Sequence, residues 1–198
     1  MRTAGAAGLA PKPLTGVWFR AIQPQFWTTA FKTLHSRGIA SRFNPGNNRF
    51  DTFYLAENHL VALLEVGAMV GTSSPGGLVA VPHRPWAVIN VTVRLGSVVD
   101  LTRPSQRKAV RTTVQELTGD WRSYAILHQL SGAKGIAPHA PTQRLGEALF
   151  LRSDVEAVVS YSAKQAYSRV LCVFPQRLKP GSRLSFFDPS TGRTLSMP

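Results

Sequence analysis

The sequence predicts a single domain of the α+β class, and three observations support this prediction. The chain has 198 residues, of which 43% are apolar, which is enough for one well-buried core but too few for two comfortable domains. Segments with strand-like and helix-like patterns are segregated along the chain, as is typical of α+β folds. No internal repeat or heptad pattern interrupts this order. We therefore expect one folded domain at residues 15–198, preceded by a flexible leader at residues 1–14.

The first elements alternate between short strands and helices. Residues 1–14 show neither the helical nor the strand period, so we expect them to be loosely held. Asn58 is the expected N-cap of a helix that carries Glu65 and ends near Gly67 or Gly71. The other segments expected in this part are a strand at 17–20, a helix at 25–36, a turn at 44–48 and a strand at 51–55.

The clearest strand follows a connector expected at 73–77. Residues 89–95 alternate apolar and polar side chains at period two, which indicates a half-buried strand. Pro104 stands in the first turn of a helix predicted at 104–117. The remaining segments are helices at 121–130 and 142–150 and strands at 157–161, 169–174 and 183–187. This return to strands completes the α+β pattern.

The chain is strongly basic, with 23 Lys plus Arg against 10 Asp plus Glu and a net charge of +13. A negative partner is expected, which composition alone leaves open as nucleic acid, an anionic cofactor, an acidic protein or a membrane surface. The basic residues are scattered, and no zinc-finger, helicase or RNA-recognition signature accompanies them. We therefore do not expect nucleic acid to be bound directly. A merely solvated basic surface fits the composition equally well.

Cysteine usage and hydropathy favour a cytoplasmic protein without a membrane partner. The single cysteine, Cys172, lies in the apolar run 170–174, which excludes an internal disulfide framework and fits a reducing compartment. No apolar stretch approaches the roughly 18 residues that a membrane-spanning helix needs. Delivery of the chain as a secreted effector stays open, because residues 1–14 neither support nor exclude it.

Several enzyme classes lack their motifs in this sequence. There is no Gly-x-Ser-x-Gly elbow, no Walker motif, no His-Glu-x-x-His and no cysteine pair. The five histidines do not fall at metal-ligand spacing, so no metal is expected. A glycosidase with two carboxylates is a poor candidate with ten acidic residues, although Glu57 and Glu65 lie eight apart and keep that reading open.

Glu65 is a carboxylate in an apolar helical segment. The positions three and four residues away on a helix are all apolar, namely Val61, Ala62, Ala68 and Met69. A carboxylate in such surroundings needs a partner or a functional role. Arg42 and Tyr54 lie just upstream. A cation, a phenol and a carboxylate within one short stretch indicate a site for a charged, aromatic ligand.

Four segments around these residues resemble the RES-domain toxins, a family named for an arginine, a glutamate and a serine. In chain order they are Gly-Val-Trp-Phe-Arg at 16–20, Ser-Arg-Phe-Asn-Pro-Gly at 41–46, Phe-Tyr-Leu-Ala at 53–56 and Ala-Leu-Leu-Glu at 62–65. Later landmarks of the family are similar to the segments at 100–102, 142–146 and 158–163. The resemblance thus covers about residues 15–188.

The resemblance implies an NAD-consuming toxin of a toxin–antitoxin pair, with a mixed-sheet core related to ADP-ribosyltransferases. It also implies an antitoxin with an Xre-type DNA-binding domain as partner, and the basic charge of this chain would suit an acidic one. The family arginines correspond to Arg20 and Arg42, the tyrosine to Tyr54, the glutamate to Glu65 and the serine to Ser162, with Ser160 as the rival.

These residue types suit the cleavage of NAD that the resemblance implies. Breaking the bond between nicotinamide and ribose builds positive charge on the ribose, which Glu65 would stabilise. Arg20 and Arg42 would bind the pyrophosphate, since a guanidinium meets phosphate oxygens bidentately. Tyr54 would offer its ring to nicotinamide and its hydroxyl to the ribose, and Ser162 would bind the carboxamide or the ribose. Glu65, Arg42 and Tyr54 are the expected catalytic residues, and no metal takes part.

The acceptor of the ADP-ribosyl group stays open. Water would make the protein a glycohydrolase, inorganic phosphate a phosphorylase, and a protein side chain an ADP-ribosyltransferase. A different class also remains, namely a non-enzymatic basic module that binds nucleic acid or a protein. The affinity of a nucleic-acid binder falls steeply with salt, whereas release of nicotinamide needs no nucleic acid.

Overall fold

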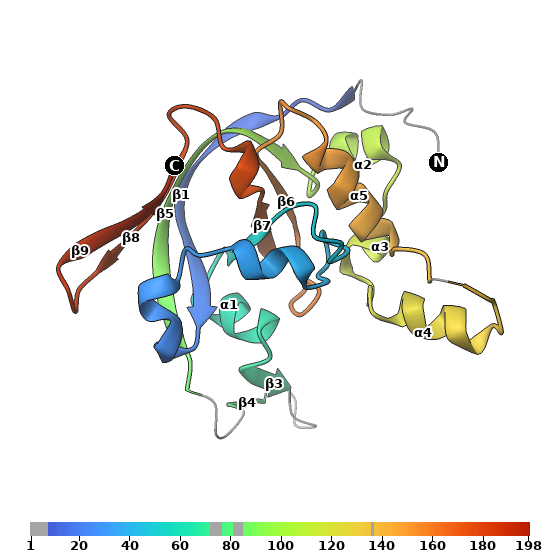
Figure 1. The fold of residues 1–198 in the computed structure, drawn as a ribbon, viewed down its shortest axis with the longest axis horizontal. Coiled ribbons are helices and arrows are strands. Elements are labelled where there is room, and N and C mark those ends of the chain that lie inside the picture. The colour runs from blue at the N-terminus through green and yellow to red at the C-terminus, as the bar shows by residue number, and fades with distance from the viewer. Residues whose placement is uncertain (1–7, 72–76, 81–84, 136) are drawn as a thin grey trace.

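A mixed β-sheet forms the centre of the molecule (Figure 1). The computed structural model describes residues 8–71, 77–80, 85–135 and 137–198. Within these residues, seven strands form one sheet in the order β1-β2-β7-β6-β5-β8-β9, and β1 also pairs with β5. The pairing of β5 with β6 is parallel, whereas the other pairings in this sheet are antiparallel. The fold is therefore a single mixed α/β domain with a mixed sheet, as the sequence predicts.

The elements follow one another along the chain as strands, then helices, then strands. The strands are β1 (Lys12–Ile22), β2 (Phe53–Ala56), β3 (Met69–Gly71), β4 (Leu78–Ala80), β5 (Ala87–Asp100), β6 (Ala157–Tyr161), β7 (Arg169–Val173), β8 (Arg183–Asp188) and β9 (Arg193–Met197). The α-helices are α1 (His59–Glu65), α2 (Pro104–Val110), α3 (Val114–Thr118), α4 (Ser123–Leu130) and α5 (Pro141–Phe150). Short 3-10 helices are η2 (Pro24–Thr29), η3 (Leu34–Gly38) and η4 (Pro175–Arg177).

A long antiparallel ribbon of β1 and β5 closes the sheet into a ring. The two strands pair continuously from Leu14 opposite Leu95 to Ile22 opposite Ala87. Along β5, Ile89, Val91, Val93 and Leu95 are buried and the residues between them are exposed, which confirms the predicted period-two strand. The buried side chains form the main core together with residues of β2, β6, β7 and β8.

A second core lies on the other face of β6 and β7, where the helices pack (Figure 1). Its members come from the segments before β1 and β2, from α3 and α5, and from β5, β6, β7 and the residues that flank them; they are Leu9, Phe43, Phe50, Val99, Leu101, Leu117, Leu149, Val155, Val158, Cys172 and Phe174. Cys172 is fully buried and free, which confirms its predicted place in the core. This second core fixes the segment that carries Arg42 against α5.

Helix α1 begins and ends where the sequence predicts. The side chain of Asn58 accepts a hydrogen bond from the backbone of Val61 at 2.9 Å and caps the helix. Gly67 lies just beyond the helix with φ of 70°, a left-handed conformation that glycine adopts without strain. Val61 and Ala62 pack against β1 and β7, so α1 lies over the sheet next to β1 and β2. Glu65 therefore stands on the last turn of a short, well-anchored helix.

Two of the predicted helices are wrong in form. The segment 25–36 does not make one α-helix but the two short 3-10 helices η2 and η3, since the hydroxyl of Thr33 donates to Asp51 at 2.9 Å and turns the chain between them. The segment 104–117 is split into α2 and α3 at Arg111, which adopts φ of 55°. Thr113 and Glu116 then form a capping box that starts α3.

Several strands also differ from the prediction in their boundaries or were not predicted at all. β1 begins at Lys12, inside the segment 1–14 that was expected to be a leader, because its first residues already pair with β5. Residues 1–7 lie outside the described residues. The strands β3, β4 and β9 were not predicted. Of the connector expected at 73–77, residues 73–76 lie outside the described residues.

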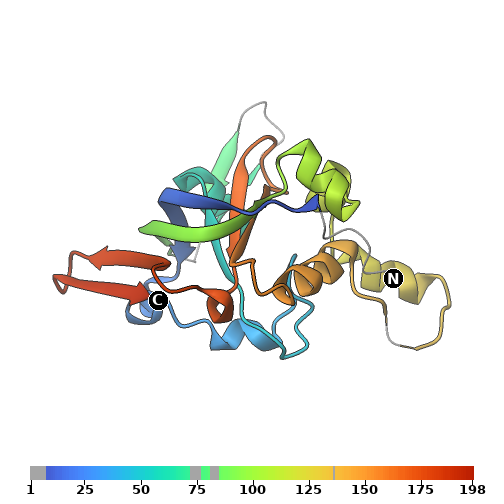
Figure 2. The same ribbon diagram turned by 90° about the horizontal axis from the view of Figure 1, so that it is seen from above.

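The molecule extends at two opposite ends, as Figure 2 shows. The hairpin of β8 and β9 projects from one end and α4 from the other. Both carry exposed apolar side chains, including Phe187 on the hairpin and Leu127 and Leu130 on α4. None of the helices in the described part of the chain has the length and hydropathy needed to cross a bilayer.

Candidate active site

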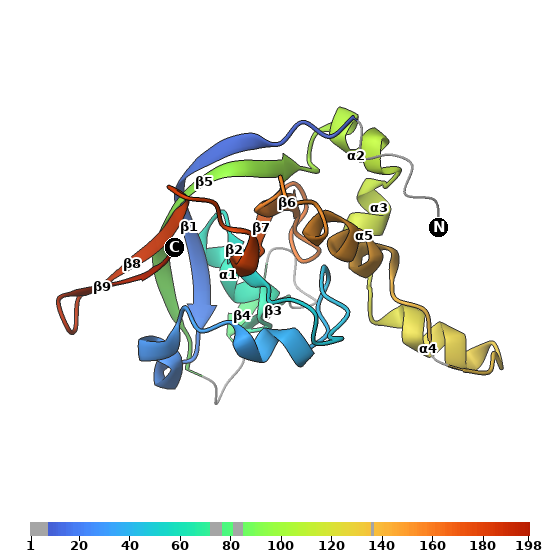
Figure 3. The same ribbon diagram turned by 45° about the horizontal axis from the view of Figure 1, so that its top comes forward.

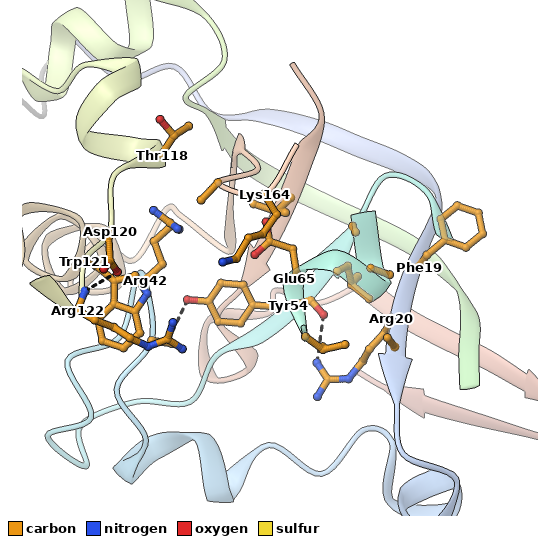
Figure 4. A pocket seen from close by; sticks show the side chains of 18 of the residues that line it. Phe19, Arg20, Arg42, Tyr54, Glu65, Thr118, Asp120, Trp121, Arg122 and Lys164 are labelled. Atoms are coloured by element: carbon orange, nitrogen blue, oxygen red, sulfur yellow. Dashed lines mark hydrogen bonds between the residues drawn. The ribbon is translucent and has the colours of Figure 1, made fainter. Parts of the chain in front are cut away.

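A cavity of about 420 Å³ opens where β1, β2 and α1 meet the loops after α3 and β6. β1 and β2 are joined by a single residue pair, Phe19 opposite Ala56, after which the two strands separate. The gap between them forms one end of the cavity. Its lining comes from segments far apart in the chain, namely 19–21, 40–42, 54–56, 62, 65–66, 118–122, 163–164 and 170. Figure 4 shows the side chains that point into it.

Glu65 lies in the wall of this cavity and is held by Ser162. The hydroxyl of Ser162 donates to Oε1 of Glu65 at 2.6 Å, a short hydrogen bond of the kind that a charged acceptor makes. The same hydroxyl oxygen accepts from the backbone N–H groups of Lys164 at 3.0 Å and Gln165 at 3.1 Å. Ser162 is thus fully used within the protein, and its contact fixes the orientation of the Glu65 carboxylate.

The two candidate serines have different environments. Ser162 follows the end of β6, is 2% exposed and is not part of the cavity lining. The expected direct contact of Ser162 with a ligand stays a prediction; in this structure its hydroxyl contacts Glu65, which lines the cavity. Ser160 lies within β6, is fully buried, and its hydroxyl has no hydrogen-bond partner among the described residues. Of the two, only Ser162 touches another predicted site residue.

The guanidinium of Arg42 is anchored at the opposite side of the site. Its Nη1 donates to the backbone carbonyls of Leu117 at 2.7 Å and Gly119 at 2.9 Å, at the C-terminal end of α3. Burial lowers the pKa of Arg42, while the negative charge of Glu65 opposes that shift. Arg42 keeps its other nitrogens available at the cavity, and it balances part of the charge of Glu65.

Tyr54 supports the Arg42 loop with its hydroxyl and faces the cavity with its ring. The hydroxyl accepts from the backbone N–H of Phe43 at 3.0 Å and shares a hydrogen bond of 2.9 Å with the hydroxyl of Ser41. Burial raises the pKa of Tyr54 well above its ordinary value, so the phenol stays protonated. The expected contact of this hydroxyl with a ribose stays a prediction, and the ring lines the cavity, where it is available for stacking.

Arg20 lies at the gap between β1 and β2. Its Nη1 donates to the carbonyl oxygen of Tyr54 at 3.1 Å, and its guanidinium lies 4.3 Å from the ring centroid of Phe53. Burial lowers the pKa of Arg20 to about 10, so the group remains a cation near neutral pH. Its Nε is buried without a hydrogen-bond partner, and Arg20 makes no ion pair with the carboxylates of the described residues.

The structure thus brings Glu65, Arg42, Tyr54 and Arg20 to one cavity, in which Tyr54 and Glu65 lie between the two arginines in the view of Figure 4. Sequence reasoning missed the other polar or aromatic lining residues, which are Phe19, Ser41, Thr118, Asp120, Trp121, Arg122 and Lys164. Apart from Phe19 on β1 and Thr118 at the end of α3, they lie on loops without regular periodicity. Only the positions of Phe19 next to Arg20 and of Ser41 next to Arg42, and the general excess of basic residues, could have pointed to any of them.

The cavity combines fixed cations, one oriented carboxylate and an apolar wall. The apolar part is formed by α1 and the strands beneath it, with Leu55, Ala56, Ala62, Val66 and Val170. Such a site can bind the phosphates of a dinucleotide and stabilise a cationic centre beside the carboxylate. Among the described residues, no group of three or more His, Cys, Asp or Glu is arranged to hold a metal ion.

Comparison with known proteins gives a family match and a similar fold. The sequence matches the family model described as the RES domain over residues 17–189. The structure is similar to a chain in the crystal structure of the M. tuberculosis MbcT–MbcA toxin–antitoxin complex, with a TM-score of 0.57 and 20% sequence identity, covering 94% of this chain and 86% of that one. At this identity the likeness concerns the fold. A search of curated proteins finds no significant match.

Proposed function

The chain belongs to the RES domain family, and on this premise we propose that it is a toxin that cleaves the bond between nicotinamide and ribose in NAD. The observation that carries the proposal is the carboxylate of Glu65, held at 2.6 Å by Ser162 in the wall of a cavity that Arg20 and Arg42 also line. A carboxylate fixed beside two cations suits a substrate that carries phosphates and develops positive charge. Residues 15–198 would form the catalytic domain, related in fold to ADP-ribosyltransferases.

In the proposed reaction, the bond from C1′ of the ribose to the nitrogen of nicotinamide breaks, and the electron pair goes to the pyridinium, which leaves neutral. Positive charge develops on the ribose, and Glu65 stabilises it with a carboxylate that Ser162 has already oriented. The apolar wall under α1 keeps water away from this charge pair and strengthens it. Glu65 is therefore the proposed catalytic residue.

The cations take different parts in this scheme. Arg20, which forms no ion pair within the described residues, is the proposed ligand of the pyrophosphate. The guanidinium of Arg42 interacts electrostatically with the carboxylate of Glu65. We therefore propose that Arg42 binds the phosphate nearest the reacting ribose. The ring of Tyr54 would stack on nicotinamide. The pKa shift of Tyr54 excludes its phenolate as a base near neutral pH.

Incubation of the pure protein with NAD tests this function directly. We expect free nicotinamide, measured by chromatography, and a product whose mass identifies the acceptor: ADP-ribose for water, its phosphate ester when inorganic phosphate is added, or a protein mass increase for a side chain. The absence of nicotinamide both with and without added phosphate would exclude the proposal. The non-enzymatic binding module would then remain.

Alanine variants of Ser162 and Ser160 test whether Ser162 positions the carboxylate of Glu65. We expect Ser162→Ala to lower kcat roughly ten- to a hundredfold, since a misaligned carboxylate loses transition-state stabilisation, and to change KM for NAD little. Ser160→Ala serves as the matched control, because it removes a buried hydroxyl without a partner in the described residues and should leave kcat unchanged. Equal kcat values for both variants would contradict a positioning role of Ser162.

We further propose that an acidic antitoxin is the partner of this chain in the cytoplasm. Two observations support the proposal: the similar structure is that of a toxin–antitoxin complex, and the chain carries a net charge of +13. A negative protein would be attracted to such a surface and held in register by complementary charges. The resemblance of the sequence favours an Xre-type antitoxin.

A further inference from the structure

A second cavity, of about 590 Å³, lies next to the first and shares Arg20 and Ala21 with it. Its lining comes from the end of β1, from Trp86 just before β5, and from η2, η3 and the residues between them, where a single helix was predicted. Figure 3 shows the backbone of these segments in the lower part of the view. Arg20 is the charged residue common to both cavities. A ligand that binds Arg20 from the first cavity therefore lies at the border of the second.

The junction of the two cavities is suited to an anion. The guanidinium of Arg20 is placed there by its hydrogen bond to the carbonyl of Tyr54 and its position over Phe53. Its Nε is buried and has no partner among the described residues. A buried donor of this kind is costly unless something binds to it, and a phosphate oxygen is the acceptor that a guanidinium binds best.

The second cavity has aromatic walls and one unused donor. Phe26 on η2 lines this cavity and is 53% exposed, so its ring is accessible to a ligand. The indole of Trp86 lines the same cavity, and its Nε1 is buried without a hydrogen-bond partner in the described part of the chain. Rings for stacking and an N–H donor are the features that bind a purine base.

The charges around this cavity fit a nucleotide as well. Its titratable lining residues are Arg20, Lys32 and His35, and no acidic residue contributes to the described lining. Gln23 and Thr29 add neutral polar groups to the lining, which can hydrogen-bond the hydroxyls of a ribose. The described lining thus combines positive charge, aromatic rings and neutral polar groups.

We infer that this second cavity is the adenosine subsite of the enzyme. The inference rests on the proposed function, and it names the place of the other half of NAD: the base lies between Phe26 and Trp86, and the pyrophosphate crosses Arg20. The nicotinamide ribose then reaches Glu65 in the first cavity. Binding energy from the adenosine half holds the reacting half in place, as remote parts of substrates do in many enzymes.

Nicotinamide mononucleotide is the probe that separates the two cavities, since it carries the reacting ribose but no adenosine. We expect the native protein to cleave NAD with a kcat/KM at least roughly tenfold above that for the mononucleotide. Phe26→Ala should raise KM for NAD roughly tenfold by loss of stacking and leave cleavage of the mononucleotide unchanged. Trp86→Phe, which keeps a ring but loses the N–H, should raise KM for NAD about threefold to tenfold.

The matched control is Phe187→Ala, which removes an aromatic ring that is 59% exposed on β8 and lines neither cavity. It should change neither substrate's parameters. An unchanged KM for NAD in both Phe26→Ala and Trp86→Phe, or an equal loss with both substrates, would overturn the subsite.

A binding measurement with ADP distinguishes a failure of the proposed cleavage reaction from a failure of the proposed adenosine subsite. If neither substrate yields nicotinamide, titration calorimetry of the native protein with ADP still reports on the second cavity. Saturable binding of ADP that Phe26→Ala weakens and Phe187→Ala does not would support the subsite while the cleavage reaction is rejected. No binding of ADP to the native protein would overturn it.

Discussion

Glu65→Gln is expected to lower kcat for nicotinamide release from NAD roughly 100- to 1,000-fold. The amide has nearly the shape of the carboxylate, and its oxygen can still accept the hydrogen bond that Ser162 donates at 2.6 Å. The change thus removes the negative charge and little else. Because that charge is proposed to act in the transition state, kcat should fall while KM for NAD changes only a few-fold.

A steady-state assay of nicotinamide release, with the midpoint of thermal unfolding measured in parallel, checks this expectation. Glu57→Gln is the matched control: Glu57 forms an ion pair with Arg169 at 2.7 Å and does not line the cavity. It should keep the native kcat, because an exposed ion pair contributes little to stability. Release of nicotinamide by Glu65→Gln at the native rate would remove Glu65 from the mechanism.

Gly146→Ala is expected to destabilise the protein by about 3 kcal/mol or more, the upper range for overpacking a rigid core. Gly146 lies in α5, where alanine would ordinarily favour the helix by about 1 kcal/mol. Here the added carbon would come within 2.6 Å of the carbonyl carbon of Phe43 and closer still to its oxygen. The sign of the effect therefore distinguishes a steric clash from helix propensity.

The backbone of Phe43 has little freedom to yield to this clash. Phe43 is fully buried, and Asn44 beside it donates to the carbonyls of Ser36 at 2.9 Å and Phe50 at 3.0 Å. The segment also carries Arg42, so whatever fraction of Gly146→Ala folds should cleave NAD more slowly. The close packing of α5 against the backbone of Phe43 thus helps to fix the position of Arg42 in the site.

Urea unfolding followed by circular dichroism measures the change, with the slope of the transition checked for two-state behaviour. Gly181→Ala provides the comparison, because its added carbon meets no atom within 4 Å and only its φ of 86° is strained. It should cost about 1–2 kcal/mol. Gly146→Ala with a free energy of unfolding at or above that of the native protein would show that α5 can move away.

Local patterns explain which elements were predicted correctly. The period-two alternation in β5 and the cap of α1 by Asn58 both depend on residues near one another in the chain. The split between α2 and α3 was also encoded locally, since Thr113 and Glu116 have the spacing of a capping box. The failure at 25–36 had another cause: Thr33 binds Asp51, and a contact across 18 residues is not visible in a helical period.

The site residues also divide into those that local sequence predicts and those that only distant contacts bring together. Glu65 was recognisable because a carboxylate among apolar neighbours needs a reason, and its resemblance to a family placed Arg20, Arg42 and Tyr54 beside it. The lining residues Lys164 and Trp121 were not recognisable, since nothing in their local sequence differs from an ordinary loop. Side chains reach such a cavity by the folding of distant segments.

The sequence by itself determined the class of fold, the helix that carries Glu65 and the residue types needed for a phosphate-bearing, cationic ligand. These follow from periodicity, capping and charge, which act over a few residues. Only the tertiary structure decided what each side chain touches: Ser162 meets Glu65 across 97 positions, and the hydroxyl of Tyr54 is taken by the Arg42 loop. The reason is physical, because hydrogen bonds depend on distances in space that the order of residues does not fix.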